Sequence, residues 1–271
     1  MKYLIAILIT LAVLAGLYVL SLRGRTGHKG LHALRGWSYA HRGLHDASRP
    51  ENSMAAFRAA LKSGYGIVLD VHLLKDGNLA VIHDSALKRT TGSEGKIEDL
   101  TTEQLSEYYL EGTFETIPTF RQVLELFDGK APLIVELKPV DDNYAKLAET
   151  ACKMLSGYTG AYCVESFDPR CVYWLKKHRP NVIRGQLTEN FLAGKNPMPW
   201  ILKFCLTHQL FNFLTMPDFV AYKYGDRKQL SNTLVRKLWG VQGVSWTLQT
   251  PAEHEAALKE NWIPIFEGYN P

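Results

Sequence analysis

Short β-like runs alternate with amphipathic helical stretches along almost all of the chain after residue 36. The strand-like runs lie at 37–41, 66–73, 79–84, 132–138, 161–167, 182–187, 218–222, 244–248 and 263–266. The helical patterns lie near 52–63, 101–108, 119–127, 142–156, 169–178, 199–213, 228–239 and 251–260. Such alternation is typical of parallel α/β architecture. We therefore predict a TIM-type (β/α)8 barrel domain over residues 37–271, close to the roughly 250 residues usual for this fold.

The strand-like runs number one more than the eight strands of such a barrel. The KDGN link at 75–78 is too short for a parallel crossover, which needs about a dozen residues. We expect one of the two runs beside it to form a hairpin outside the barrel.

The chain begins with an uncharged, largely apolar run at 3–22. As a helix this run would be roughly 30 Å long, the thickness of a bilayer's hydrocarbon core. No A-x-A-like cleavage site follows before the first charges, so we favour a transmembrane anchor at 1–22 over a cleaved signal peptide. Residues 23–36 would then be a linker.

Basic residues follow this run more than they precede it. Lys2 lies before it, whereas Arg23, Arg25, Lys29 and Arg35 lie after it. The positive-inside rule then predicts a single-pass membrane protein whose barrel domain is cytoplasmic. This cluster supplies much of the net charge of +4, and no basic stripe with interleaved aromatic residues predicts a nucleic-acid partner.

Polar side chains close several strand-like runs, and the active site of a barrel gathers at the carboxyl ends of its strands. His41 closes the first run, and His83 and Asp84 close the third. The period-two alternation of a strand turns Asp70 toward the barrel interior, where an ionised carboxylate is costly without a cation. Glu136 and Lys138 share one face, which pairs a possible metal ligand with an ammonium for phosphate.

The order and spacing of these residues resemble the glycerophosphodiester phosphodiesterase family. The shared motifs read HRG at 41–43, PENS at 50–53, Asp70 on the second strand, KDG at 75–77, HD at 83–84, RTTG at 89–92 and ELK at 136–138. The likeness is strong over 37–138 and looser through 166–167 and 244–247. It implies hydrolysis of glycerophosphodiesters to glycerol 3-phosphate and an alcohol.

The resemblance also implies one divalent cation, Mg²⁺ or Ca²⁺, and two histidines that act as general acid and base. Asp70 and Glu136 are the candidate metal ligands, because carboxylate oxygens suit hard cations. His41 and His83 are the candidate catalytic residues, because imidazole titrates near neutral pH.

Four further side chains complete the predicted site. Arg42 and Lys138 would hold the phosphate, the former through its planar donor fork. Glu51 either orients Arg42 or caps the helix that starts near residue 52. Trp246 matches a family aromatic residue that lines the substrate pocket, although it could equally belong to the core.

One position departs from the family pattern. The family places a metal-binding Glu two residues before the Asp of the second strand, and here that position is Val68. Losing one anionic ligand should weaken metal affinity. Three interpretations remain: a weakened enzyme, an enzyme rescued by water, Glu51 or His72 as a substitute ligand, or a non-catalytic barrel that binds phosphodiesters.

The anchor would bring the barrel close to lipid, which makes lysophospholipids a second candidate substrate class. An apolar, aromatic-rich stretch could contact an acyl chain or the bilayer: Trp200, Phe204, Leu210, Phe211, Phe213 and Leu214. The alternative is an ordinary barrel helix with a nearby loop.

Overall fold

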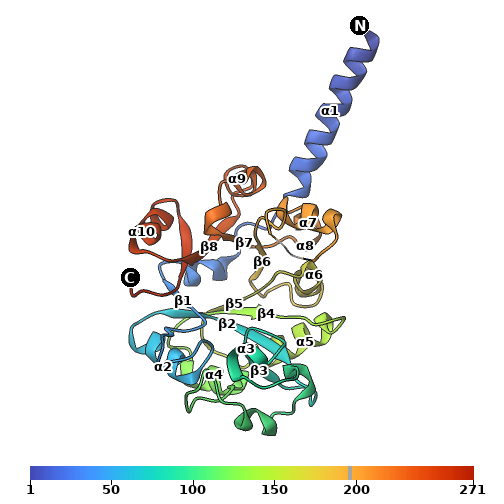
Figure 1. The fold of residues 1–271 in the computed structure, drawn as a ribbon. Coiled ribbons are helices and arrows are strands. Elements are labelled where there is room, and N and C mark those ends of the chain that lie inside the picture. The colour runs from blue at the N-terminus through green and yellow to red at the C-terminus, as the bar shows by residue number, and fades with distance from the viewer. Residues whose placement is uncertain (195–196) are drawn as a thin grey trace.

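Eight parallel strands close into a barrel, as predicted (Figure 1). The computed structural model describes residues 1–194 and 197–271. The barrel strands are β1 (Tyr39–His41), β2 (Gly66–Leu73), β4 (Leu133–Leu137), β5 (Tyr162–Ser166), β6 (Arg184–Thr188), β7 (Phe219–Lys223), β8 (Gln242–Leu248) and β9 (Trp262–Phe266). Strand β1 pairs with both β2 and β9, and this pairing closes the cylinder.

The strand-like run at 79–84 forms the expected hairpin with the run before it. Strand β3 (Leu79–Val81) runs antiparallel to β2 after the turn at 75–78. Behind it, α3 (Lys88–Thr91) and short 3-10 helices at Ile97–Asp99 and Glu103–Glu107 surround a separate apolar cluster. Ile82 donates its backbone N–H to the Asp70 carbonyl at 3.2 Å. The segment after β3 therefore places His83 near the carboxyl end of β2.

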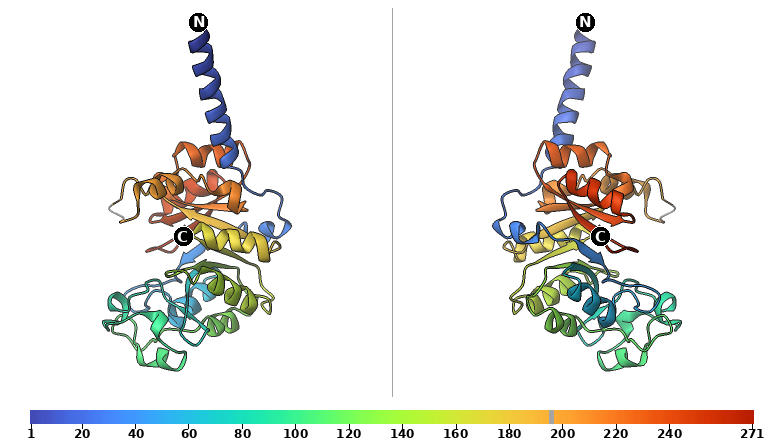
Figure 2. Two further views of the ribbon diagram at one scale, coloured as in Figure 1. Left: turned by 90° about the vertical axis from the view of Figure 1, so that its right-hand side faces the viewer. Right: turned by 90° about the vertical axis from the view of Figure 1, so that its left-hand side faces the viewer.

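Helices cover the outside of the barrel (Figure 2). They are α2 (Met54–Lys62), α4 (Phe120–Phe127), α5 (Tyr144–Leu155), α6 (Pro169–His178), α7 (Trp200–Thr207), α8 (Asn212–Thr215), α9 (Leu230–Lys237) and α10 (Pro251–Lys259). Their starts follow local capping chemistry. Ser53 caps α2, Thr119 and Gln122 form a capping box on α4, and Asp168 caps α6 ahead of Pro169.

Alternation along the strands separates two apolar cores. On β2, Ile67 and Leu69 pack with the outer helices, whereas Val68 joins the cluster inside the barrel. The interior is crowded, since a Cβ atom at Gly185 would lie 2.1 Å from the ring of Phe219. The lower barrel is thus a packed core, and the buried carboxylates Asp70, Glu136 and Glu165 lie toward the carboxyl ends of their strands.

The segment predicted as a linker folds against the barrel. A 3-10 helix at Lys29–Leu34 places Leu31 and Leu34 in the interior cluster, and the Tyr39 hydroxyl donates to the Leu34 carbonyl at 2.9 Å. Arg25 pairs with buried Asp218, which precedes β7. Residues 23–36 are therefore part of the packed barrel domain rather than a free linker.

The N-terminal run forms a single helix, α1 (Lys2–Ser21), which projects away from the barrel beside α7, α8 and α9 (Figure 1). At its base Leu22 is fully buried, and Trp239 donates its indole N–H to the Val19 carbonyl at 2.9 Å. The helix has a mean hydropathy of 2.6 and is long enough to cross a membrane, although a signal sequence would share both properties.

Candidate active site

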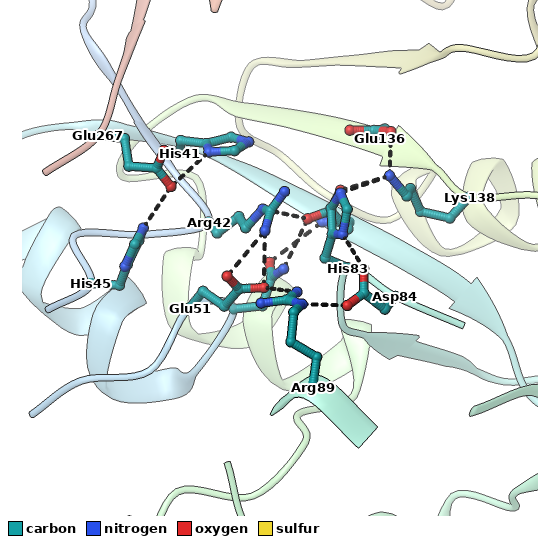
Figure 3. Close-up of polar contacts among 12 residues, drawn as sticks. His41, Arg42, His45, Glu51, His83, Asp84, Arg89, Glu136, Lys138 and Glu267 are labelled. Carbon is teal, nitrogen blue, oxygen red and sulfur yellow. Dashed lines mark hydrogen bonds and ion pairs between the residues drawn. The ribbon is translucent and has the colours of Figure 1, made fainter. Parts of the chain in front are cut away.

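The predicted site residues converge at the carboxyl ends of β1, β2 and β4 (Figure 3). Asp70 and Glu136 are register partners on β2 and β4, and His41 is the last residue of β1. Lys138 places its ammonium 2.8 Å from Glu136 Oε1, 3.7 Å from Asp70 Oδ1 and 3.1 Å from His83 Nε2. These five side chains therefore form one polar cluster above the apolar interior.

A carboxylate after β9 orients His41. Glu267 Oε1 lies 3.1 Å from Nδ1 of His41 and 3.0 Å from Nε2 of His45 (Figure 3). Burial alone would raise the pKa of Glu267, but hydrogen bonds and charge interactions with the two imidazoles hold that pKa far below its usual range. With Nδ1 engaged by Glu267, the Nε2 atom of His41 is the nitrogen positioned to exchange a proton with a substrate.

Hydrogen bonds fix the tautomer of His83. Its Nδ1 lies 2.6 Å from Asp84 Oδ1, while Nε2 faces the Lys138 ammonium, which can only donate. Burial, aided by the charges of Lys138 and Arg42, lowers the pKa of His83 against the opposing pull of Asp70 and Asp84. His83 is therefore neutral at neutral pH, with its proton on Nδ1 and a lone pair on Nε2.

Arg42 is held by two carboxylates. Its Nη1 donates to both oxygens of Glu51 at 3.0 Å, and its Nε lies 3.5 Å from Asp70 Oδ2. Arg89 bridges Glu51 and Asp84, and so ties the Arg42 side of the site to the His83 side. Glu51 thus orients Arg42, and the alternative that it caps the helix is wrong, because Ser53 supplies the cap of α2.

The backbone beside the site adopts an uncommon conformation. Arg42 and Asn52 have φ values of 56° and 54°, in the left-handed region that non-glycine residues seldom occupy. Asn52 donates its backbone N–H to the Arg42 carbonyl at 2.8 Å and its side-chain amide to Asp70 Oδ2 at 2.9 Å. Asn52 thereby connects the loop that carries Arg42 and its own loop to Asp70.

Burial dominates the electrostatics of the carboxylates. Burial, reinforced by repulsion from Asp70, raises the pKa of Glu136 to about 7 against the attraction of Lys138. For Asp70, the charges of Lys138, His83 and Arg42 outweigh burial and hold the pKa below its usual range. Glu165 on β5 lies beside Glu136, and its pKa is raised well above normal by burial and by both neighbouring carboxylates.

These residues suit a hard divalent cation. Their donors are carboxylate oxygens, and Asp70 Oδ1 is buried without a hydrogen-bond partner. Over residues 1–194 and 197–271, however, no three His, Cys, Asp or Glu side chains already form a metal-binding group. The Lys138 ammonium lies between Asp70 and Glu136 and supplies positive charge there.

The two substitute ligands considered for the missing carboxylate are both occupied. His72 is buried, with Nδ1 2.6 Å from Glu98 Oε1 and Nε2 3.1 Å from the His83 carbonyl. Glu51 is engaged by two arginines. Neither side chain is free to replace a ligand at the position of Val68.

Trp246, on β8, is partly exposed. Its indole N–H donates to the Ala221 carbonyl at 3.1 Å, and its ring meets that of Phe167 edge-on at 5.6 Å. Lys138 Nζ lies 6.0 Å from the centre of the Phe167 ring. Trp246 therefore supports the mouth through Phe167, and its contact with substrate remains a prediction.

Sequence reasoning assigned no role to Glu267, His45, Asp84 or Glu165. A strand-end position was the available signal for Glu267 and Asp84, and the alternation along β5 was the signal for Glu165. The hydrogen bond between His45 and Glu267 joins loops that lie 222 residues apart in the sequence. Local sequence carries no signal for such a contact.

A model of the Glycerophosphoryl diester phosphodiesterase family matches residues 41–266. The chain belongs to this family. A glycerophosphodiester phosphodiesterase of Caldanaerobacter subterraneus is 31% identical over 230 residues, covering 81% of this chain and 88% of that protein. One from Bacillus altitudinis is 44% identical over 113 residues, 39% of this chain and 46% of that protein.

Solved structures agree on the fold. A phosphodiesterase of Oleispira antarctica, solved in complex with the product sn-glycerol-3-phosphate, has a TM-score of 0.73 at 19% identity and covers 90% of this chain and 95% of its own. A glycerophosphodiester phosphodiesterase from Thermotoga maritima has a TM-score of 0.65 at 23% identity, covering 85% and 93%. The predicted family, barrel fold and class, a phosphoric diester hydrolase, are confirmed.

Replacing Asp84 with Asn should impair His83 specifically. We expect Asp84→Asn to lower kcat/KM for glycerophosphocholine by about a hundredfold, because an amide no longer enforces the Nδ1–H tautomer. Asp84 favours the protonated imidazole, so its loss lowers the pKa of His83 further. The acidic limb of the kcat/KM profile should therefore move to lower pH.

Asp128→Asn is the control for this measurement, because Asp128 is an exposed carboxylate at the end of α4 and lies outside the site. An Asp84→Asn enzyme with unchanged kcat/KM and pH profile would contradict the role given to His83.

Proposed function

We propose that the barrel mouth hydrolyses glycerophosphodiesters to glycerol 3-phosphate and an alcohol, with one Mg²⁺ or Ca²⁺ ion. The observation that carries this proposal is the convergence of two differently oriented imidazoles, one ammonium and buried carboxylates. Asp70 and Glu136 would hold the cation. When bound, the cation would stabilise negative charge that develops on the phosphoryl oxygens.

The protein groups divide the remaining work. His83, neutral with its lone pair on Nε2, would accept a proton from the water molecule that attacks the phosphorus. His41, held through Nδ1 by Glu267, delivers a proton from Nε2 to the leaving oxygen. Lys138 and Arg42 hold the phosphate oxygens, since both cations face Asp70 at the centre of the cluster. Trp246 would line the pocket beside the substrate.

A large apolar cavity favours a substrate that carries an acyl chain on its glycerol. It measures about 1090 Å³, and His83 and Lys138 are among its lining residues. Its apolar walls come from Phe167, Phe191, Leu202, Leu206, Phe211 and Leu214. This space extends beyond what glycerol phosphate needs and is large enough for an acyl chain. The cavity supports lysophospholipids as substrates alongside water-soluble glycerophosphodiesters.

The position of the N-terminal helix supports a cavity that faces a bilayer. Helices α7 and α8 form one wall of the cavity, and they lie beside the base of α1 (Figure 1). Trp200, Ile201 and Phe213 on these helices are exposed. We infer a single-pass protein with these helices toward the membrane and the barrel in the cytoplasm, as the flanking charges favour.

A second function is a barrel that binds phosphodiesters without hydrolysing them. The observation that favours it is Val68, which removes one carboxylate of the family's metal site. The survival of both histidines, Lys138 and Arg42 in one cluster weighs against this alternative.

Metal removal distinguishes the two functions. We expect EDTA to abolish hydrolysis of glycerophosphocholine by the detergent-solubilised chain, because the buried carboxylates then lose the cation that stabilises phosphoryl charge. Adding Mg²⁺, Ca²⁺ or Mn²⁺ should restore release of glycerol 3-phosphate. Binding of glycerophosphocholine without hydrolysis under all three ions would establish the non-catalytic barrel. Hydrolysis that persists in EDTA would contradict the proposed dependence on a metal ion.

A charge on the cavity wall tests the lipid substrate. Leu202→Lys should lower kcat/KM for lysophosphatidylcholine about 30-fold, because it removes an apolar contact and places an ammonium beside the acyl chain. The value for glycerophosphocholine should change less than about twofold. Leu258→Lys, on exposed α10, is the control. Equal losses for both substrates would contradict an acyl-binding cavity.

A further inference from the structure

Three carboxylates form a row across adjacent strands at the barrel mouth. Asp70 on β2 is the register partner of Glu136 on β4, and Glu136 is the register partner of Glu165 on β5. On β5, Cys163 belongs to the interior cluster and Val164 to the outer one. The alternation therefore turns Glu165 into the barrel, toward the same space as Asp70 and Glu136.

Within residues 1–194 and 197–271, one oxygen of the Glu165 carboxyl group is buried without a hydrogen-bond partner. This atom is Oε2, and the Glu165 side chain is 1% exposed. The nearest cation in the row, Lys138, is already engaged by Glu136 and Asp70. A buried carboxylate without hydrogen bonds or a counter-ion is strongly unfavourable, so the position requires positive charge from a ligand or a proton on the carboxyl group.

The row also explains how a cation site can exist without a carboxylate at position 68. Val68 lies two residues before Asp70 on β2 and is part of the apolar interior. Glu51 and His72 are occupied elsewhere. We propose that Glu165 is the third carboxylate of the cation site and replaces, from the β5 side of Glu136, the ligand that Val68 cannot provide.

This inference rests on the proposed metal-dependent function. Three carboxylates and one divalent ion leave a single negative charge, which Lys138 balances, so that Arg42 remains for the phosphate. The three side chains are not preformed as a cage in the described chain, because the Lys138 ammonium lies among them. The proposal therefore requires these side chains to rotate toward one another when a cation binds.

Direct cation binding to the full-length, detergent-solubilised protein tests the proposal. Mn²⁺ affinity is measured by electron paramagnetic resonance, and Mg²⁺ affinity by calorimetry, for the wild type, Glu165→Gln and Val68→Glu/Glu165→Gln. We expect Glu165→Gln to weaken binding by about tenfold or more, because it removes one anionic ligand without changing its size. The double variant should regain most of the affinity.

Thermal unfolding provides a second readout and shows that the variants fold. In EDTA, Glu165→Gln should have a Tm equal to or above that of the wild type, because it removes an unpaired buried carboxylate. Added Mn²⁺ should raise the Tm of the wild type more than that of Glu165→Gln. Glu255→Gln, at an exposed position on α10 away from the row, should behave as the wild type throughout.

The outcomes separate the two proposals. A wild type that binds no cation overturns both this inference and the metal in the proposed function. A wild type that binds Mn²⁺ with an affinity unchanged in Glu165→Gln overturns only the role of Glu165, and leaves that residue a protonated core acid. A double variant that binds no better than Glu165→Gln overturns the equivalence of positions 68 and 165.

Discussion

The arrangement of this site follows from the burial of carboxylates in the upper barrel with too little protein charge to balance them. Asp70 and Glu165 are 1% exposed and Glu136 is 6% exposed, and Lys138 is the only ammonium that the described chain places among them. Buried charge of one sign is tolerated where a ligand of the opposite sign completes the site. A phosphate held with its cation would be such a ligand.

A second layer of contacts fixes the groups around this row. Glu267 and Asp84 each engage the Nδ1 atom of one histidine, so the proposed proton transfers fall to the two Nε2 atoms. Arg89 connects Asp84 with Glu51, and Glu51 in turn positions Arg42. Because these residues come from different strand ends, the closed barrel itself is the element that brings the two imidazoles to one mouth.

Periodicity and motif order were sufficient to predict the barrel, the hairpin after β2 and the clustering of His41, His83 and Lys138, because these depend on local pattern and on strand ends meeting at one mouth. They were not sufficient for contacts set by the closed cylinder. Glu267 meets His45 only because β9 closes against β1. Glu165 gains significance only from its register with Glu136. The role of residues 23–36 was also hidden, since Leu31 and Leu34 are too few to show a periodic signal.

Anomalous X-ray scattering from crystals grown with Mn²⁺ and glycerol 3-phosphate would test the central claim most directly, because it locates the cation without reference to activity. The account predicts one strong peak within ligand distance of Asp70 and Glu136, with the phosphate between Lys138 and the two histidines. A peak elsewhere on the protein, or phosphate bound at the mouth with no cation at the carboxylates, would contradict it.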